Sequence, residues 1–566
     1  MENQRNNSRP YDLRVEHWIP WACRDRVEWG PPSLLGRTQE GAGDTTTGIS
    51  APRPDFTGAI QEFLIGLLAV AMLPEDDDEW RERWEHPPTV EELQDRFNAL
   101  PEAFDLDGDG PRFFQDLSST DFADVEPTPI DQLLIESPGE QTMKLNKDLF
   151  IKRRRVERMG RPAAAMALLT MQTYAPAGGQ GHRTSLRGGG PLTTLADPRV
   201  DREGVPDPKQ PLWRKLWANV PTRESLSRFP SFEERETMEY VFPWLARTRL
   251  SNPPSGRSVT PEDANPLQAY FGLPRRIRLE FAGAGQCDLT GRDDDAVVTG
   301  FRMRNYGVQY SAWEHPLSPH YKNAKGEWLP IHGQPDGVAW RDWLGFTLRS
   351  PEAAKIPAIA VATAMDKTRR NFDVPIIRVH AFGFDMDNMK ARGWTEAVLP
   401  AFPGLAPDQQ QLVMNTAARL IQAADIASGA LRSAVERALF EKPDDAPGDL
   451  SKVKSELWSA TEAEFYRVVK LVAIGTATSD LADDEARGFA AVLERVSLGI
   501  FDRWCPVEAA SVTALRRTVG ARFSLVMTLR GKSKVGGKLF GALGITREET
   551  KAPPKKKAKA RSARRK

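Results

Sequence analysis

The sequence predicts an α+β protein, with a large mixed α/β N-terminal domain with long loops (residues 1–400) followed by an all-α four-helix bundle (residues 401–530). At 566 residues the chain is too long for one compact core. The first 400 residues are rich in proline, glycine and tryptophan, and turn signals interrupt their short apolar runs. After Pro407, proline becomes scarce and helical apolar periodicity begins. Residues 531–566 are Gly/Lys-rich and then almost wholly basic, which predicts a basic flexible tail.

Individual segments support this division. In the N-terminal part, residues 56–73 and 163–173 have the apolar spacing of helices, whereas 276–281, 296–301 and 375–381 have the composition of strands. These segments do not alternate as regular βαβ units, so we expect a mixed arrangement with long loops. In the C-terminal part, four apolar-periodic stretches with short connections predict an antiparallel bundle: 408–441, 449–475, 481–504 and 507–530.

Composition limits the function class. The 77 basic and 77 acidic side chains balance, which argues against a uniformly basic surface but leaves local basic patches open. Cys23, Cys287 and Cys505 form no CxxC pair, so neither a disulfide framework nor a cysteine zinc site is supported. The start lacks the apolar core of a signal peptide, and the most apolar run, 63–73, is too short to span a bilayer. We therefore expect a cytoplasmic protein with no membrane association and no cofactor.

Two patterns imitate metal sites. Asp105, Asp107 and Asp109 resemble the start of a calcium-binding loop, but the seventh, eighth and twelfth positions carry unsuitable residues. A metal-dependent nuclease built on these three aspartates is one alternative function, although such acidic turns are commoner as solvated loops. His315 and His320 flank two prolines in a rigid turn and have no acidic or cysteine partner at ligand spacing. We expect both patterns to be structural and to hold no metal.

A glycine-rich segment at residues 176–194 carries the strongest functional signal. Six glycines within thirteen residues prevent regular structure and let the backbone approach a ligand closely. His182, Arg183 and Arg187 add positive charge among these glycines. Exposed amides with nearby arginines suit a nucleic-acid backbone or groove edge. On chemistry alone, a flexible loop without a ligand explains the segment equally well.

An aromatic residue followed by a basic run occurs near residue 150. The run comprises Phe150, Lys152, Arg153, Arg154 and Arg155. This combination suits the end of a single-stranded RNA, because the ring can stack on one base while the cations neutralise phosphates. The alternative is the solvated start of a basic helix.

Several separate motifs carry a resemblance to a known family. Residues 18–20 are Trp-Ile-Pro, residues 113–116 are Phe-Phe-Gln-Asp, and residues 186–194 are Leu-Arg-Gly-Gly-Gly-Pro-Leu-Thr-Thr. A Gly-Phe pair at 300–301 and a His-Pro-Leu-Ser-Pro run at 315–319 precede the four predicted helices. Together these motifs resemble the CasA family, the large subunit of the type I-E CRISPR Cascade surveillance complex.

The resemblance implies a set of binding residues. In this family, three elements read the protospacer-adjacent motif (PAM), a short duplex sequence beside the target, from the minor groove. The family's glycine loop corresponds to Gly178, Gly179, Gln180 and Gly181. Its basic finger corresponds to Arg302 or Arg304, and its polar wedge to Asp387, Asn388 and Met389. Its aromatic loop, which anchors the subunit at the 5′ handle of the guide RNA, corresponds to Phe150 with Lys152, Arg153 and Arg154.

The same resemblance implies the partners and the absence of catalysis. The expected partners are the guide RNA (crRNA), double-stranded target DNA, the backbone and small subunits of Cascade, and the CRISPR helicase-nuclease. Some family members carry a cysteine-rich zinc knuckle before the Gly-Phe pair, but only Cys287 lies in that region here, so we expect no zinc. A metal-dependent nuclease and a generic RNA-binding scaffold remain the alternative functions.

Overall fold

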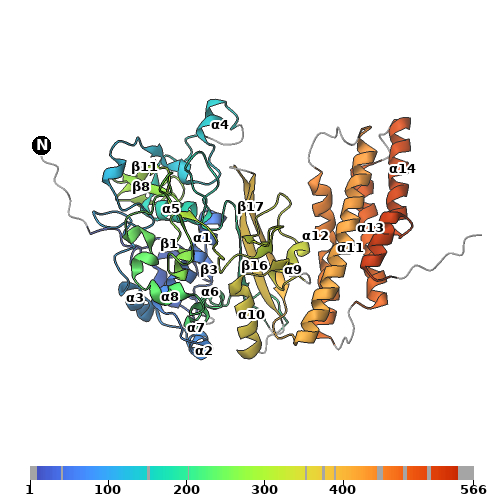
Figure 1. Cartoon of the computed structure of the whole chain (residues 1–566), viewed down its shortest axis with the longest axis horizontal. Coiled ribbons are helices and arrows are strands. Elements are labelled where there is room, and N and C mark those ends of the chain that lie inside the picture. Colours follow the sequence, from blue (N-terminus) through green and yellow to red (C-terminus); the bar gives the residue numbers. More distant parts are fainter. Residues whose placement is uncertain are drawn as a thin grey trace, which may run out of the picture. The chain divides into compact units, whose positions relative to one another are not determined.

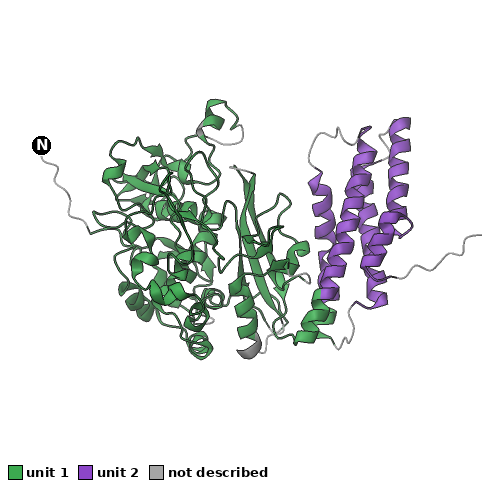
Figure 2. Cartoon of the chain, in the orientation of Figure 1, with its two compact units in different colours: residues 1–414, 470–476 green, residues 415–469, 477–566 purple. Residues whose placement is uncertain are grey.

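The chain divides into two compact units (Figure 2). Residues 1–414 and 470–476 form the first unit, and residues 415–469 and 477–566 form the second. The predicted domain limits at residues 400 and 530 stay predictions. The computed structural model describes residues 9–39, 42–148, 153–201, 203–350, 354–371, 376–387, 390–442, 450–475, 481–506 and 511–545.

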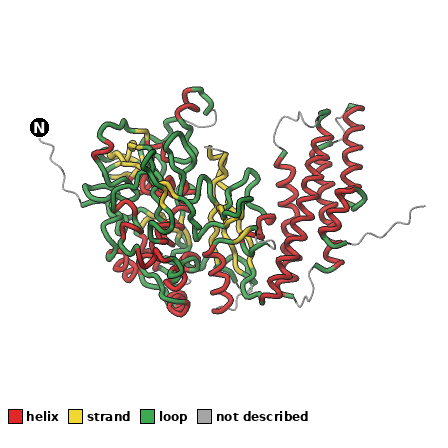
Figure 3. The backbone as a smooth tube through the Cα atoms, in the orientation of Figure 1, coloured by secondary structure: helices red, strands yellow, loops and turns green. Residues whose placement is uncertain are grey.

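Helices and strands mix in the first unit, whereas long helices make up the second (Figure 3). This arrangement confirms the predicted α+β class. The remaining helices of the first unit, besides α1 and α5 described below, are α2 (Asp77–Glu85), α3 (Val90–Asn98), α4 (Glu140–Lys144), α6 (Leu212–Trp217), α7 (Arg223–Leu226), α8 (Pro230–Glu234), α9 (Trp343–Phe346) and α10 (Ile359–Asn371).

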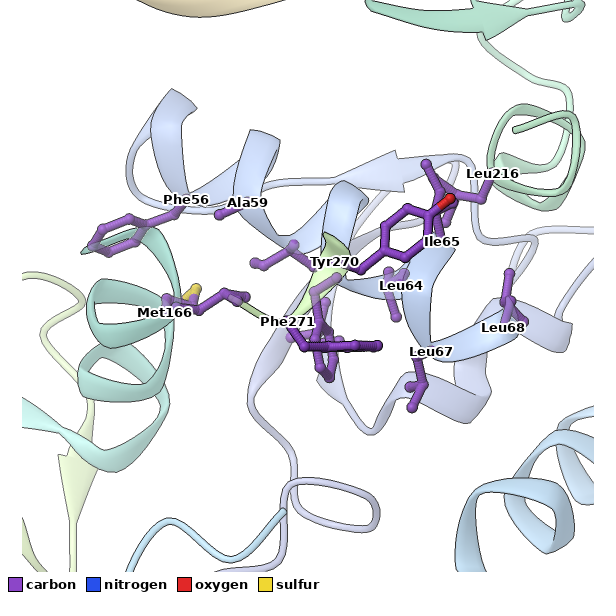
Figure 4. Packing of buried hydrophobic residues seen from close by; sticks show 14 of the residues in the cluster. Phe56, Ala59, Leu64, Ile65, Leu67, Leu68, Met166, Leu216, Tyr270 and Phe271 are labelled. Carbon is purple, nitrogen blue, oxygen red and sulfur yellow. The ribbon is translucent and has the colours of Figure 1, made fainter. Parts of the chain in front are cut away.

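Helix α1 (Pro54–Ala71) lies at the centre of the first unit (Figure 1). Pro54 at the first helical position and an acidic residue in the first turn favour its start. Tyr270 and Phe271 lie against it, and Gly66 lets Tyr270 approach so closely that any Cβ there would collide with it (Figure 4). Among the described helices α1 alone is long and apolar enough to cross a membrane, yet 78% of it is buried inside the fold, as expected for a core helix.

Aromatic rings fill the core beside this helix. Trp18 and Phe63 meet edge to face with centroids 5.8 Å apart, and Phe63 meets Phe113 in the same way at 5.5 Å. Next to Phe113, the buried Gln115 donates to the Leu106 carbonyl oxygen at 2.8 Å and accepts a backbone N–H at 2.9 Å. The two aromatic motifs quoted above are therefore explained by packing and by satisfying buried polar groups.

The strands of the first unit form several small sheets. Four of them have three or four strands: β2–β1–β3 (Val27–Gly30, Ile19–Ala22, Gly48–Ile49), β4–β11–β5 with β8 also on β11 (Thr128–Pro129, Val297–Arg304, Met159–Gly160, Arg276–Phe281), β14–β13–β15 (Trp328–Pro330, His320–Lys322, Lys355–Ile356) and β17–β16–β6 (Lys390–Ala401, Ile377–Asp387, Leu192–Asp197). The two-stranded sheets are β10–β9 (Asp293–Asp294, Gly285–Gln286) and β12–β7 (Gln309–Tyr310, Ser258–Val259). Only β12 and β7 pair in parallel among the described strands.

Sequence patterns located most of the central elements. The strand expected at 276–281 coincides with β8, and the helix expected at 163–173 is α5 (Arg161–Tyr174). The strand expected at 375–381 is only the first part of the longer β16. Local composition did not predict its partners β6 and β17, because long-range pairing determines where they lie.

Four long helices appear in the C-terminal part at the expected places. They are α11 (Pro407–Leu439), α12 (Ser451–Ile474), α13 (Asp483–Trp504) and α14 (Val512–Leu529). Leu457 and Phe465 on α12 are fully buried, as their helical spacing predicted. The periodic signal is strong here because each helix buries one apolar face against its neighbours.

The predicted flexible tail is wrong over its first part. Residues 531–545 are structured and include α15 (Lys534–Ala542), whose Ser533 hydroxyl accepts the Gly536 N–H at 2.9 Å as an N-cap. Leu539, Leu543 and Ile545 are buried, so apolar burial stabilises this short helix despite its glycines and lysines. Residues 546–566 lie outside the described part of the chain.

Candidate nucleic-acid interface

The glycine loop connects α5 to β6. Its base is closed by the Ser185 N–H, which donates to the Ala175 carbonyl oxygen at 3.0 Å. The φ angles of Gly181 (+79°) and Gly190 (+76°) are positive, so these two turns need glycine. At Gly179, by contrast, an added Cβ would meet no atom within 4 Å. The loop is thus fixed at these two glycines, whereas Gly179, which precedes both of them, is open to solvent.

A buried ion pair supports the loop from below. The Arg187 guanidinium donates to the Glu62 carboxylate of α1 at 2.7 Å, and its side chain is only 2% exposed. Glu62 also accepts from the hydroxyls of Tyr174 and Thr193, each at 2.6 Å. Arg187 was expected to supply charge to a ligand, and this expectation is wrong. Its charge is used inside the fold, because a carboxylate buried in α1 requires a cation.

On one side the loop is bound to the end of β11. The Tyr306 N–H donates to the Gly181 carbonyl oxygen at 2.8 Å, and Gln180 donates to the Tyr306 hydroxyl at 3.3 Å. An added Cβ on Gly181 would lie 2.8 Å from that of Asn305. The Arg183 guanidinium stacks over the Tyr306 ring at 5.5 Å. The polar face beside the loop is therefore formed by Asn305, Tyr306 and Arg183.

On the other side the loop leads into β6, which pairs with β16. The register sets Leu192 opposite Gly383. A Cβ on Gly190 would collide with the side chain of Met386 near the end of β16. His332 donates from Nδ1 to the Gly189 carbonyl oxygen at 2.7 Å, and burial lowers the pKa of this histidine. These contacts bring the loop together with the hairpin that β16 forms with β17.

The wedge hairpin consists of β16 and β17. Arg392 of β17 donates to both carboxylate oxygens of Asp385, at 2.8 and 2.7 Å, next to a bulge in β16. Asp387 lies at the end of β16, with its side chain 59% exposed and 3.7 Å from Arg392. The predicted tip residues Asn388 and Met389 lie outside the described residues.

The two candidates for the basic finger both lie in β11. Arg302 donates from Nε to Glu280 at 2.7 Å, and Arg304 forms an ion pair with Asp124. Both side chains are partly exposed. Arg304 also lines a cavity of about 550 Å³ together with Tyr306. Each of these two cations already has a carboxylate partner. The residues that directly touch the glycine loop are Asn305 and Tyr306, which follow β11.

The predicted RNA anchor is only partly described. Phe150 and Lys152 lie outside the described residues. Arg153 donates to both oxygens of Asp148, at 2.6 and 2.7 Å, which lowers the pKa of that carboxyl. Arg154 is exposed, and its φ of +59° marks a tight turn. Arg153 is thus paired with Asp148, and the exposed Arg154 and Arg155 follow it in the sequence.

The acidic turn and His315 have internal partners. Asp107 accepts the Tyr11 N–H at 2.8 Å, and burial raises the pKa of Asp105. His315 accepts the Leu317 N–H at 3.1 Å, and its other ring nitrogen lies 3.0 Å from a carbonyl oxygen. Over the described ranges, no group of three or more His, Cys, Asp or Glu side chains could hold a metal ion.

The fold and the site define a class: a mixed α/β unit that gathers a glycine loop, a strand end and a β-hairpin, followed by a helical unit. The family model of CRISPR-associated protein Cse1 matches residues 12–500. The chain belongs to this Cse1 (CasA) family.

Solved structures share the fold at low sequence identity. CasA of Thermus thermophilus is 17% identical, with 92% of this chain and 99% of that chain covered and a TM-score of 0.63. Cse1 of Thermobifida fusca is 16% identical, with 95% and 99% covered and a TM-score of 0.64. A chain of a CRISPR RNA-guided surveillance complex is 16% identical, with 92% and 100% covered and a TM-score of 0.61.

Proposed function

We propose that this chain is the non-catalytic large subunit of a cytoplasmic type I-E RNA-guided surveillance complex. In this role it recognises the PAM in duplex DNA, helps to open the duplex and recruits the helicase-nuclease. Membership of the Cse1 family and similarity to a chain of an RNA-guided surveillance complex support the proposal. Its partners are then the guide RNA, the target DNA and the backbone and small subunits.

The observation that carries the proposal is the connection between three predicted elements. The glycine loop is hydrogen-bonded to Tyr306 at the end of β11, and it continues directly into β6, which pairs with the wedge hairpin. Elements separated by more than a hundred residues in sequence thus form one assembly. A duplex that contacts the loop meets the strand end and the hairpin at the same time.

This assembly is suited to the minor groove. Gly179 has open space where a Cβ would project, so the backbone can approach base edges closely. Arg183 is stacked on Tyr306 and forms no ion pair with a carboxylate in the described parts of the chain, so its charge remains available to a phosphate. The minor groove distinguishes base pairs poorly, and we therefore expect tolerance for several flanking motifs.

The hairpin supplies strand opening in this account. Arg392 and Asp385 brace its two strands close to the tip. Asn388 and Met389 at that tip enter beside the PAM, where an apolar wedge can unstack one base step at a cost of a few kcal/mol. The first guide–target base pairs then form where the duplex is already open. Asp387, Arg302 and Arg304 flank this contact.

The loop after Asp148 anchors the guide RNA. Arg153 pairs with Asp148, and the exposed Arg154 and Arg155 follow Phe150 and Lys152 closely in the sequence. Stacking on an aromatic ring with nearby cations suits a single-stranded 5′ end. No observation in the described ranges favours the alternative metal-dependent nuclease, because the three aspartates are not gathered around a common centre.

The proposal is tested by purifying the complex that assembles around this chain. The bound RNA is sequenced, and the complex is then presented with duplex targets whose flanking sequence is randomised. We expect a guide RNA together with other subunits, and enrichment of a small set of flanking motifs. A complex that binds RNA but selects no flanking sequence would identify a generic RNA-binding scaffold instead.

A further inference from the structure

A buried arginine lies beneath the glycine loop. Arg275 precedes β8, is only 5% exposed, and donates from Nη2 to the Pro176 carbonyl oxygen at 2.6 Å. Its Nε and Nη1 atoms are also buried, yet neither has a hydrogen-bond partner among the described residues. Buried guanidinium donors are rarely left unused, because an unpaired polar group loses its hydration without compensation. The two donors therefore need an explanation.

No carboxylate of the described residues compensates the charge of Arg275. Burial alone lowers the pKa of Arg275 to about 10, so the group stays protonated at neutral pH. Its neighbour Arg276 differs, because it forms ion pairs with Asp116 at 2.6 Å and Asp121 at 2.7 Å. Two adjacent buried arginines thus have opposite environments. Only the one under the glycine loop lacks an anion within the described structure.

Backbone amides without a partner among the described residues follow shortly after Pro176, the residue that Arg275 contacts. The N–H groups of Gly178, Gly179, Gln180 and Gly181 donate to none of the described residues. Consecutive free amides in a turn form a concavity that attracts anions. Burial and, to a smaller extent, the charge on Arg275 lower the pKa of the adjacent His182, so this ring stays neutral at pH 7 and adds no charge of its own.

We propose that Arg275 and the amides of residues 178–181 form a binding site for one backbone phosphate of the target duplex. The inference deepens the proposed function and depends on it, because the phosphate belongs to the duplex that the glycine loop contacts. The amides contact the phosphate oxygens, and the guanidinium attracts the anion from beneath through the poorly screened interior. The phosphate contact sets the register in which the loop meets base edges.

A purely structural role for Arg275 predicts a different behaviour. In that case its only task is to hold the Pro176 carbonyl through Nη2. Arg275→Gln keeps a side-chain donor but removes the charge, whereas Arg275→Lys keeps the charge but removes the planar fork. Arg278→Gln serves as a matched control, because Arg278 is also a buried arginine of this segment but has Asp116 and Glu280 nearby.

The experiment measures duplex binding by the assembled complex as a function of salt concentration. Each phosphate contact contributes about 0.9 to the slope of log K against log salt on B-DNA. We expect Arg275→Gln to lower the slope by about one such contact and the affinity roughly 10- to 100-fold. Arg275→Lys and Arg278→Gln should keep the wild-type slope.

Single methylphosphonates, which remove one phosphate charge at a time, locate the contact. Along the flanking duplex, one position should weaken the wild type and Arg275→Lys but leave Arg275→Gln unchanged. The inference would be overturned if each methylphosphonate weakened duplex binding equally in Arg275→Gln and in the wild type, and if Arg275→Gln kept the wild-type salt slope. The failure of the proposed function itself is distinct, since the wild type would then show no dependence on the flanking motif. If Arg275→Gln does not fold, the wild type and Arg275→Lys are compared instead. A methylphosphonate position that weakens duplex binding by both proteins supports the site, and the lack of such a position overturns it.

Discussion

Two basic loops of the first unit are supported in contrasting ways. The glycine loop rests on the buried Arg187–Glu62 ion pair and is bound on both sides to strands. The basic segment near residue 150 is described only at Asp148 and from Arg153 onward, and these two residues form an ion pair whose arginine side chain is 47% exposed. In the proposed roles, a loop that reads a groove edge must hold its backbone in place, whereas a segment that anchors a single strand need only gather charge and a stacking ring. The difference leads to predictions of unequal size.

Removing the buried cation should have the largest effect. Arg187→Met leaves the Glu62 carboxylate buried without its ion-pair partner, so we expect the free energy of unfolding to fall by about 3–5 kcal/mol. Urea unfolding of the purified chain measures this change. The double variant Glu62→Met, Arg187→Met removes both charges and should recover part of the loss. A single variant as stable as the double one would mean that the pair does not support the loop.

A methyl group at the second turn should have a smaller effect. Gly190→Ala forces a positive φ on alanine and a collision with Met386, which should cost about 1–3 kcal/mol of unfolding free energy. The matched control is Gly179→Ala, where the added Cβ meets open space and stability should not change. Thermal unfolding compares the two variants. Equal stability of both would show that the loop tolerates movement against the hairpin.

The stability that His332 contributes beside the glycine loop should depend on pH. Because burial lowers the pKa of His332 below 6.5, the unfolded chain takes up a proton before the folded one as the pH falls. This histidine therefore contributes stability above about pH 6.5 that is lost on acidification. His332→Gln keeps a donor for Gly189 but does not titrate, so its unfolding free energy should decline less on acidification from neutral pH. Parallel curves for the two proteins would exclude the role of His332.

Breaking the Arg153–Asp148 pair should have the smallest effect on stability. Arg153→Gln removes a pair whose arginine side chain is 47% exposed, although its carboxylate is only 5% exposed, and pairs that are open to solvent contribute about 0–1 kcal/mol. Combined with Phe150→Ala, the change should still release the chain from its complex at moderate salt, because the RNA contact loses a ring and a charge. Co-purification at increasing salt measures the release. If the double variant stayed fully bound to the complex, the assignment of this segment as the RNA anchor would be contradicted.

Local patterns predicted the parts of the fold that local physics determines. The four long helices and β8 lie where periodicity and composition placed them, since each buries one face along its own length. The sequence alone could not show that the charge of Arg187 is paired with Glu62, a residue 125 positions away. It also missed Tyr306 and Arg275, whose positions under and beside the glycine loop follow from the pairing of β8 with β11. An Asn-Tyr-Gly turn signal directly after β11 was the one local indication of Tyr306.

The same reasoning explains the error at the end of the chain. Glycine and lysine in residues 531–538 outweighed Leu539 and Leu543 in the prediction of a tail. In the folded protein, a serine cap and these two buried leucines determine the local structure. Burial against neighbouring helices is a tertiary effect that composition does not record.

The most direct test of the account is the response of Gly179→Asp to three targets: duplex with the flanking motif, duplex without it, and single-stranded DNA. The added carboxylate projects into open space, so it should repel the duplex without unfolding the loop. Complexes assembled with this variant should lose most of their binding to the first target and almost none to the single strand. Equal losses on duplex and single strand would contradict the account, because the loop would then hold the complex together and would not read DNA.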